Sequence, residues 1–403
     1  MAAPQTPYEA VLHAARDVAK LDCALDAEML GTALLGSVYS VATTDRAAAV
    51  RDFVGNFLGA TTRRRTAAAT TIREVFATLV PDADGASDVR PGPQAPSWTT
   101  QLGRVRPTGC WAYGDVYGDQ TSYLVTFAYD DAGDGGPEHA VVALVDHNIG
   151  ITKDVFVGSS ASRILEQVRE MCDDDELTWF REEDPGRVRG EVNKHLEITD
   201  GLGDLPADGS LATDRALAAA RLALLPAATT PPLAEPRTPP TTDFARDFLG
   251  SPEAARFGLD KITADDELAS LHFCISLILD HAASLPSADP LRWSPAVAGL
   301  FLLDWVHRRA VLDMDDAAML PRVTRAWSAY ATRRRGLPDA AVTQTDEMVE
   351  EMIPEFARLY ATGERRSPAT AAVAQLISEG VDPNDTDAID AWLEANRDHL
   401  DGS

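Results

Sequence analysis

Hydrophobic residues recur at helical spacing in the first 80 residues and again from residue 243 onward. Near the N-terminus Val11, Ala15 and Val18 share one face, because residues three or four positions apart lie on the same side of a helix. The same spacing predicts a small bundle with further helices at 26–42, 44–59 and 66–80. The later region predicts a helix carrying Leu268, Leu271 and Ile275, and then helices at 295–312, 318–335, 344–361, 368–379 and 386–399.

Residues 100–158 show the period of two that is typical of strands. The segment SYLVTFAY (122–129) places Tyr123, Val125, Phe127 and Tyr129 on one side and Leu124, Thr126 and Ala128 on the other. HAVVALVDH (139–147) is more continuously apolar, which predicts a strand covered on both faces, and ITKDVFV (151–157) predicts a third strand. A helix with Ile164, Leu165 and Val168 on one stripe follows. Because the connections are short, we expect an antiparallel meander backed by that helix.

Two proline-rich stretches divide the chain, at 81–97 and at 226–242. Proline lacks the amide donor and favours extended backbone, so neither stretch is expected to form a helix or a central strand. The sequence therefore predicts a predominantly helical α+β protein. We expect a helical bundle at 1–80, an antiparallel sheet with backing helices at 98–225, a linker at 226–242 and a helical domain at 243–403. Whether the bundle and the sheet share one core stays open.

The composition indicates a folded protein with an acidic surface. Hydrophobic residues make up 45% of the 403, and the formal net charge is −27 at pH 7. The N-terminal segment is interrupted by Glu9, Arg16 and Asp17 and lacks the pattern of a secretion signal, so we expect a cytoplasmic protein. No apolar run approaches the ~18 residues of a membrane helix. The four cysteines (Cys23, Cys110, Cys172 and Cys274) form no CxxC pair, which predicts buried thiols and neither disulfides nor a zinc site.

The acidic balance disfavours nucleic-acid binding, because a negative surface repels phosphate backbones. Basic residues cluster only at Arg63–Arg65, His307–Arg309 and Arg333–Arg335. Gly336, Leu337 and Pro338 follow the last cluster, as at a helix end, where arginines complement the helix dipole. The sequence therefore explains this cluster as a helix cap.

The chain lacks the glycine-rich phosphate loop, the GxGxxG turn, the GxSxG elbow and the HExxH motif. One local set of residues offers chemistry: Asp115, Asp119, Asp146 and His147 lie where the first predicted strand begins and the second ends. Antiparallel neighbours bring these ends together, so the four are candidate ligands of a divalent cation. Asp146 and His147 are alternatively a candidate catalytic pair, with His147 as the proton shuttle. Aspartates at strand ends also commonly shape turns, which is the competing structural explanation.

Four segments carry a resemblance to a known group of proteins: DVYGDQTSYLVTFAY (115–129), HAVVALVDHNIGITKDVFV (139–157), WSPAVAGLFLLDWVHRRAVLD (293–313) and RAWSAYATRRRGLP (325–338). In these segments the chain resembles a family of actinobacterial conserved hypothetical proteins that has no established activity. The resemblance implies a shared fold and assigns no catalytic residue.

We therefore expect an interaction or regulatory protein whose acidic surface offers a face to a protein partner. The alternative is a metal-dependent hydrolase or a related enzyme with its site at Asp115, Asp119, Asp146 and His147. No membrane association is expected, and the sequence leaves the oligomeric state open.

Overall fold

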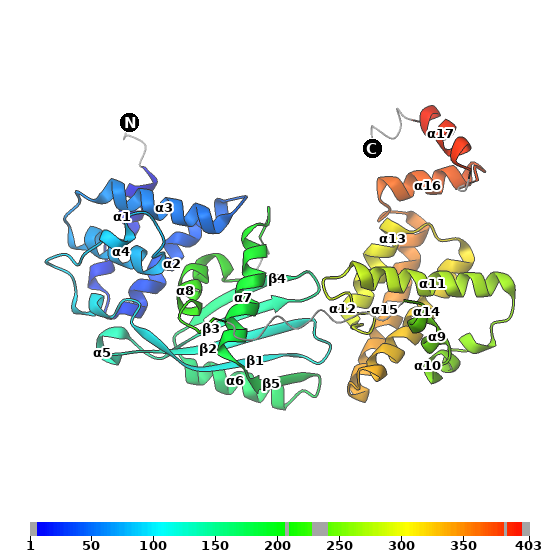
Figure 1. Ribbon diagram of the computed structural model, residues 1–403, viewed down its shortest axis with the longest axis horizontal. Coiled ribbons are helices and arrows are strands. Elements are labelled where there is room, and N and C mark those ends of the chain that lie inside the picture. Colours follow the sequence, from blue (N-terminus) through cyan, green and yellow to red (C-terminus); the bar gives the residue numbers. More distant parts are fainter. Residues whose placement is uncertain (1–5, 206–208, 228–240, 383–384, 397–403) are drawn as a thin grey trace. The chain divides into compact units, whose positions relative to one another are not determined.

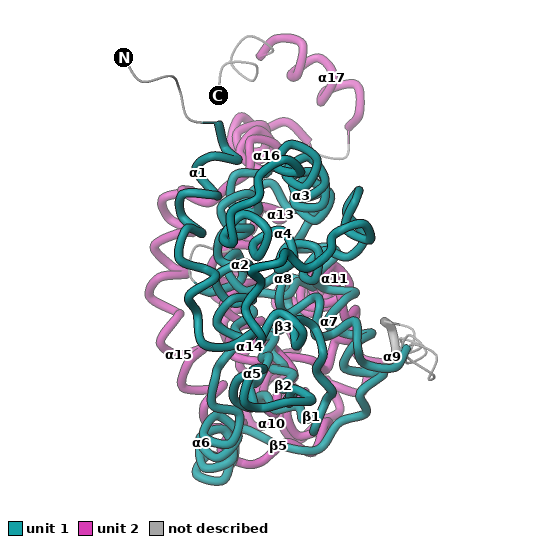
Figure 2. The backbone as a smooth tube through the Cα atoms, turned by 90° about the vertical axis from the view of Figure 1, so that its left-hand side faces the viewer, with its two compact units in different colours: residues 1–115, 120–233 teal, residues 116–119, 234–403 magenta. Residues whose placement is uncertain are grey.

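Two groups of secondary-structure elements form two units of the chain. The computed structural model describes residues 6–205, 209–227, 241–382 and 385–396. Unit 1 comprises Met1–Asp115 and Gln120–Leu233, and unit 2 comprises Val116–Asp119 and Ala234–Ser403 (Figure 2). Most of the predicted linker at 226–242 lies outside the described residues. The fold is α+β and predominantly helical.

Unit 1 begins with the helices α1 (Pro7–Ala14), α2 (Ala24–Val41), α3 (Arg46–Thr61) and α4 (Ala67–Leu79). Side chains at the N-caps explain where three of them start. Thr6 and Glu9 form a capping box on α1, Asp45 accepts the Ala48 amide on α3, and Thr66 accepts the Ala69 amide on α4. The ends of α2, α3 and α4 lie within about two residues of the predicted ranges, the usual uncertainty of helix boundaries.

The sheet of unit 1 is antiparallel and five-stranded, with the order β4-β3-β2-β1-β5. Its strands are β1 (Val105–Asp115), β2 (Gln120–Tyr129), β3 (His139–Asp146), β4 (Ile151–Gly158) and β5 (Thr178–Glu182). The three predicted strands are confirmed as β2, β3 and β4. β1 and β5 were not predicted; β1 has an irregular register between Pro107 and Gly109, and β5 has only five residues.

Different helices cover the two faces of this sheet. They are α6 (Ala161–Asp173), α7 (Pro185–Asp200) and α8 (Leu211–Leu222), and the short α5 (Ala132–Gly135) joins β2 to β3. Leu124, Ala140 and Val142 pack against α6, which Figure 1 shows on the side of the sheet away from α1–α4. Val125 and Phe127 point the other way, into a core that also contains buried residues of the bundle, α7 and α8. The bundle and the sheet therefore share one hydrophobic core.

Unit 2 is helical in the residues described. Its helices are α9 (Thr241–Leu249), α10 (Pro252–Arg256), α11 (Asp265–Ser284), α12 (Pro295–Leu300), α13 (Val306–Arg309), α14 (Met314–Arg334), α15 (Asp339–Thr362), α16 (Pro368–Ser378) and α17 (Thr386–Ala395). The predicted helix at 295–312 is interrupted by a π-helical turn at Phe301–Trp305. Trp293, Phe301 and Trp327 are buried in its core.

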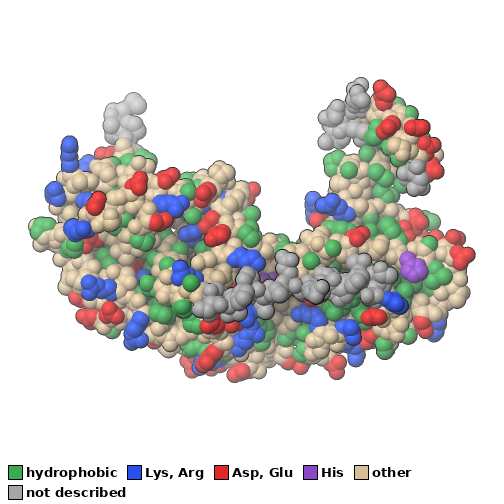
Figure 3. Space-filling model, in the orientation of Figure 1, with side chains coloured by type: hydrophobic (Ala, Val, Ile, Leu, Met, Phe, Trp, Pro, Cys, Tyr) green, Lys and Arg blue, Asp and Glu red, His purple; other side chains and the backbone are tan. Residues whose placement is uncertain are grey.

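Charged side chains of both signs are interspersed over the face shown in Figure 3, and acidic ones gather over α17. In the part of the chain that the structure describes, no helix combines the length and the hydrophobicity needed to cross a bilayer.

Candidate functional site

The strand ends that carry the predicted acids do meet. The register of β2 and β3 pairs Gln120 with Asp146. Asp115 Oδ2 accepts the Gln120 amide at 2.8 Å, Asp146 Oδ1 accepts the Asn148 amide at 3.0 Å, and Gln120 Nε2 donates to Asp146 Oδ2 at 3.3 Å. These bonds are the ones expected of aspartates that shape strand ends and turns.

The other two predicted residues have different surroundings. His147 Nε2 lies 3.0 Å from Thr121 Oγ1, and its ring stands edge-on to His195 at a centroid distance of 5.6 Å. Asp119 groups with unit 2, where its Oδ1 lies 3.6 Å from Arg292 Nη2.

No group of three or more His, Cys, Asp or Glu side chains within the described ranges is arranged to hold a metal ion. The cation site at Asp115, Asp119, Asp146 and His147 therefore stays a prediction, as does the catalytic pair Asp146 and His147. The geometry of the described residues lends neither of them support.

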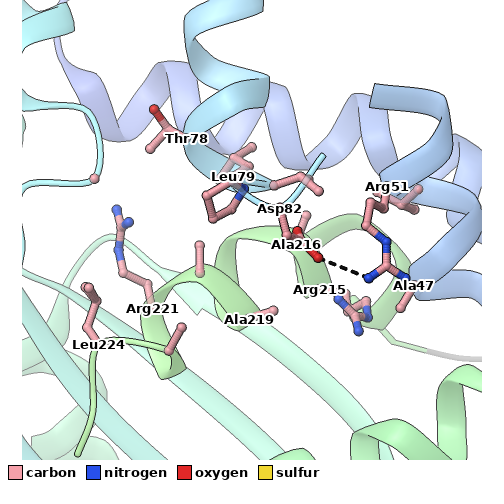
Figure 4. A pocket seen from close by; sticks show the side chains of 16 residues that line it. Ala47, Arg51, Thr78, Leu79, Asp82, Arg215, Ala216, Ala219, Arg221 and Leu224 are labelled. Carbon is pink, nitrogen blue, oxygen red and sulfur yellow. Dashed lines mark hydrogen bonds and ion pairs between the residues drawn. The ribbon is translucent and has the colours of Figure 1, made fainter. Parts of the chain in front are cut away.

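A cavity of about 480 Å³ lies in unit 1 between α3, the end of α4 and α8 (Figure 4). Most of its lining is apolar and includes Val50, Leu79, Val80 and Leu224. Its volume falls in the range of about 300–1,000 Å³ that small-molecule sites occupy.

The sequence of α8, LATDRALAAARL, explains why the space exists. Ala216, Ala219, Ala220 and Ala223 recur at helical spacing and line the cavity. Leu217 and Leu222 of the same helix are buried in the hydrophobic core. Larger side chains on the alanine stripe would fill the volume, so α8 fixes one wall and leaves the cavity open.

Three guanidinium groups reach this cavity, from Arg51 on α3 and from Arg215 and Arg221 on α8. In Figure 4 Arg215 and Arg221 stand on either side of Ala219. Arg51 Nη1 pairs with Asp82 Oδ2 at 3.0 Å.

The carboxylate pairs of Arg215 and Arg221 are largely buried. Arg215 is held by two hydrogen bonds to Asp200, one of them 2.9 Å from Nε to Oδ1. The Tyr39 hydroxyl also donates to Asp200, at 2.7 Å.

Arg221 belongs to a buried polar network. Its side chain is 1% exposed, and that of Glu28 on α2 is fully buried. Arg221 Nη2 donates to Glu28 Oε2 and to the Tyr129 hydroxyl, while Tyr129 itself donates to Glu28 Oε2 at 2.5 Å. Glu28 Oε1 accepts the Gly103 amide at 2.8 Å, and Gly103 adopts a positive φ of 68°. The network thus joins α2, β2 and α8.

His139 of β3 also belongs to this network, and its imidazole is neutral. Burial, together with the charge of Arg221, lowers the pKa of His139 to about 4. Arg221 Nε donates to His139 Nε2 at 3.0 Å, and a guanidinium can only donate, so Nε2 must accept and Nδ1 carries the proton. Nδ1 lies 3.4 Å from the Pro137 carbonyl oxygen, its acceptor. Burial also raises the pKa of Tyr129, which keeps its hydroxyl protonated.

One donor of this network remains available. Arg221 is among the residues lining the cavity, and its Nη1 has no hydrogen-bond partner among the described residues. The charge of Arg221 is balanced by Glu28, yet the Nη1 edge of its guanidinium can still donate to a ligand oxygen.

We expect the stability of unit 1 to fall as the pH is lowered from 6.5 toward 4. Between these values the unfolded chain protonates His139 and the folded chain does not, because its pKa is about 4 in the fold and 6.5 ordinarily. Protonation therefore favours unfolding, with a full effect of about 3 kcal/mol reached below pH 4. Urea unfolding at stepped pH, followed by labelling of the buried Cys110 thiol with an acid-active disulfide reagent, measures this effect.

His139→Gln is the matched variant, since glutamine accepts a hydrogen bond and does not titrate. Its stability should depend less on pH in the same window. An unchanged pH slope would show that another group controls the acid sensitivity of unit 1.

The sequence analysis did not single out Arg221, Glu28 or the cavity. The helical spacing of the alanines in α8 could have been recognised in the sequence. The pairing of Glu28 with Arg221 could not, because the two residues are 193 positions apart and no local pattern connects them. Comparison of the chain with protein-family models, with curated proteins and with solved structures finds no match.

Proposed function

We propose that this chain is a regulatory protein whose unit 1 binds a small organic carboxylate with an apolar body. The observation that carries the proposal is that Nη1 of Arg221, a residue lining a largely apolar cavity, has no hydrogen-bond partner among the residues that the structure describes. Nη1 of Arg221 can donate to a carboxylate oxygen, and such a charge-assisted hydrogen bond is stronger than one between neutral groups. The alanine wall of α8 suits the hydrocarbon part of such a ligand.

The buried network supplies a route for regulation. A carboxylate bound at Nη1 adds a second negative charge beside Arg221 and close to Glu28, and this charge weakens the attraction that holds Arg221 to Glu28. Glu28, Tyr129 and Arg221 lie on α2, β2 and α8, and a change in their bonding alters how the bundle packs on the sheet. Ligand binding then shifts unit 1 between two packing arrangements.

The net charge supports the proposed kind of partner, and the state of the cysteines supports the proposed cellular compartment. A net charge of −27 favours a basic protein as the regulated partner and disfavours nucleic acid. Cys23, Cys110, Cys172 and Cys274 are buried and unpaired, as is usual in the reducing cytoplasm, where we place the protein.

Octanoate is the probe for this cavity, and octanol is its neutral counterpart. We expect octanoate to raise the melting temperature of the wild-type protein, because a ligand that binds only the folded state stabilises it. Octanol, which lacks the carboxylate for Arg221, should have a much smaller effect. In Ala220→Leu the added side chain occupies the cavity, so the octanoate shift should disappear.

Ala60→Leu is the control, since Ala60 is exposed on α3 and does not line the cavity. This variant should respond to octanoate like the wild type. Equal shifts in Ala220→Leu and Ala60→Leu, or equal shifts with octanoate and octanol, would contradict the proposal.

A further inference from the structure

The two edges of the sheet in unit 1 differ in how their backbone groups are used. The strand order β4-β3-β2-β1-β5 makes β4 one edge and β5 the other. At the β4 edge, Thr199 Oγ1 of α7 accepts the Thr152 amide at 3.0 Å. Asp214 Oδ2 of α8 accepts the Val157 amide at 2.8 Å. Side chains of two helices therefore close this edge against another strand.

The part of β1 that extends beyond β5 is protected in another way. β5 pairs only with the second half of β1, from Trp111 onward, so the first half lies at the edge. This half contains Pro107, which has no amide to donate, and its register is irregular between Pro107 and Gly109. Proline and irregular pairing are both devices that prevent an edge from accepting a further strand. β5 has neither of them.

The outer edge of β5 presents unused backbone groups. Glu183, directly after the strand, donates its amide to the Cys110 carbonyl of β1 at 3.1 Å. Along an antiparallel ladder alternate residues face the same neighbour, so the amides of Phe180 and Glu182 face away from β1. Neither of these amides donates to any other group within the described ranges. The edge is thus ready to pair with a strand.

This edge is complementary to a second copy of itself. With a two-fold axis at Phe180, the Phe180 residues of the two copies exchange amide–carbonyl hydrogen bonds. Each Glu182 amide then meets the Thr178 carbonyl of the other copy. The Thr178 amide needs no partner there, because it already donates to the Asp175 carbonyl at 3.0 Å. The pairing therefore satisfies the outward amides of β5.

The side chains of β5 favour the same register. It places Trp179 opposite Arg181 of the second copy, and within one chain the Arg181 guanidinium already lies over the Trp179 ring at 4.3 Å. It also places Glu182 opposite Thr178, so no like charges face each other. An axis at Arg181 or at Glu182 would set like charges directly opposite, which is destabilising. Trp179 and Phe180 are only partly buried, so pairing also removes apolar surface from water.

We propose that two copies of this chain associate through β5, which joins their sheets into one continuous antiparallel sheet. The arrangement is self-complementary, because a two-fold axis brings the same residues of both copies together. β5 shares no residue with the cavity of unit 1, so the association does not depend on the ligand proposed for that cavity.

Sedimentation equilibrium of the full chain tests this assignment. The wild-type protein should have the mass of two chains at submillimolar concentration. Glu182→Pro should weaken the association by about tenfold or more, because an outward amide is lost from both copies. Proline is tolerated where an edge strand turns its amide to solvent, so unit 1 of this variant should still fold.

Glu176→Pro is the matched control. Glu176 is exposed, and it follows Asp175 in the turn that the bond from Thr178 to Asp175 closes, where proline is favoured. The substitution removes the same charge as Glu182→Pro and leaves the outward amides of β5 in place. This variant should associate like the wild type.

A disulfide tests the register. In Thr178→Cys/Glu182→Cys the introduced thiols of the two copies face each other at a Cα distance of about 5.5 Å, which a disulfide can span. Oxidation should therefore yield a covalently linked dimer. In Thr178→Cys alone the two thiols lie about 14 Å apart, since a strand rises about 3.4 Å per residue, and no linked dimer should form.

Three results would overturn the proposal. They are a monomeric wild-type protein, equal association of Glu182→Pro and Glu176→Pro, and the absence of a linked dimer after oxidation of Thr178→Cys/Glu182→Cys. The second result would show that the copies associate through a surface other than β5.

Discussion

Replacing Arg221 with methionine should destabilise unit 1 by about 3–5 kcal/mol, because a buried charge is left without its partner. Glu28 is fully buried, and Arg221 is the cation that pairs with it. In Arg221→Met the donors left to the Glu28 carboxylate among the described residues are the Tyr129 hydroxyl and the Gly103 amide. Urea unfolding, followed by labelling of the Cys110 thiol, measures the loss in unit 1.

The double variant Glu28→Gln/Arg221→Met is the matched control for this experiment. Both charges are absent from it, so it should be more stable than Arg221→Met alone, as double-mutant cycles show for coupled pairs. A loss below about 1 kcal/mol in Arg221→Met would mean that the network contributes little to the stability of unit 1.

Trp327→Ala should destabilise unit 2 by about 3–5 kcal/mol, the usual cost of removing a large aromatic side chain from a core. Trp327 is fully buried, and its ring lies 5.0 Å from that of Phe248. Its indole Nε1 donates to the Pro290 carbonyl at 3.2 Å, so the substitution removes both packing and a hydrogen bond. The buried thiol of Cys274 on α11 reports unfolding of this unit.

Trp327→Phe keeps most of the ring contacts and loses the hydrogen bond, so it should cost clearly less than Trp327→Ala, by about 2 kcal/mol or more. Similar losses in the two variants would indicate that the Pro290 bond, and not the volume of the ring, dominates the contribution of Trp327.

The sequence predicted those elements whose pattern is regular. β2, β3 and β4 alternate or are continuously apolar, and they were predicted within a few residues. β1 was missed because Pro107 and Gly109 break its alternation where its register shifts. The π-helical turn at Phe301–Trp305 was not predicted either, since its sequence, FLLDW, also fits a regular α-helix.

The sites were harder to predict because they depend on contacts between distant segments. The meeting of Gln120 and Asp146 followed from antiparallel pairing and was expected. Glu28 and Arg221 each look like ordinary charges on a helix, and only the fold buries them together. Likewise, β5 was not predicted, and only the order of the strands places it at an edge of the sheet.

The shared core of unit 1 also sets the order of events during synthesis. Arg221 and Glu28, which form a hydrogen bond, are 193 positions apart in the sequence. The hydrogen bond from the Leu217 amide to Thr32 Oγ1 joins residues with a similar separation. At about 5–20 residues per second, a ribosome needs roughly 10–40 s to make that stretch. During this interval α2 can pack against α3 and α4, but Glu28 has no Arg221 to pair with and the surface of α2 that α8 covers stays exposed. The N-terminal helices are therefore expected to need a chaperone or a slow final docking step until α8 emerges.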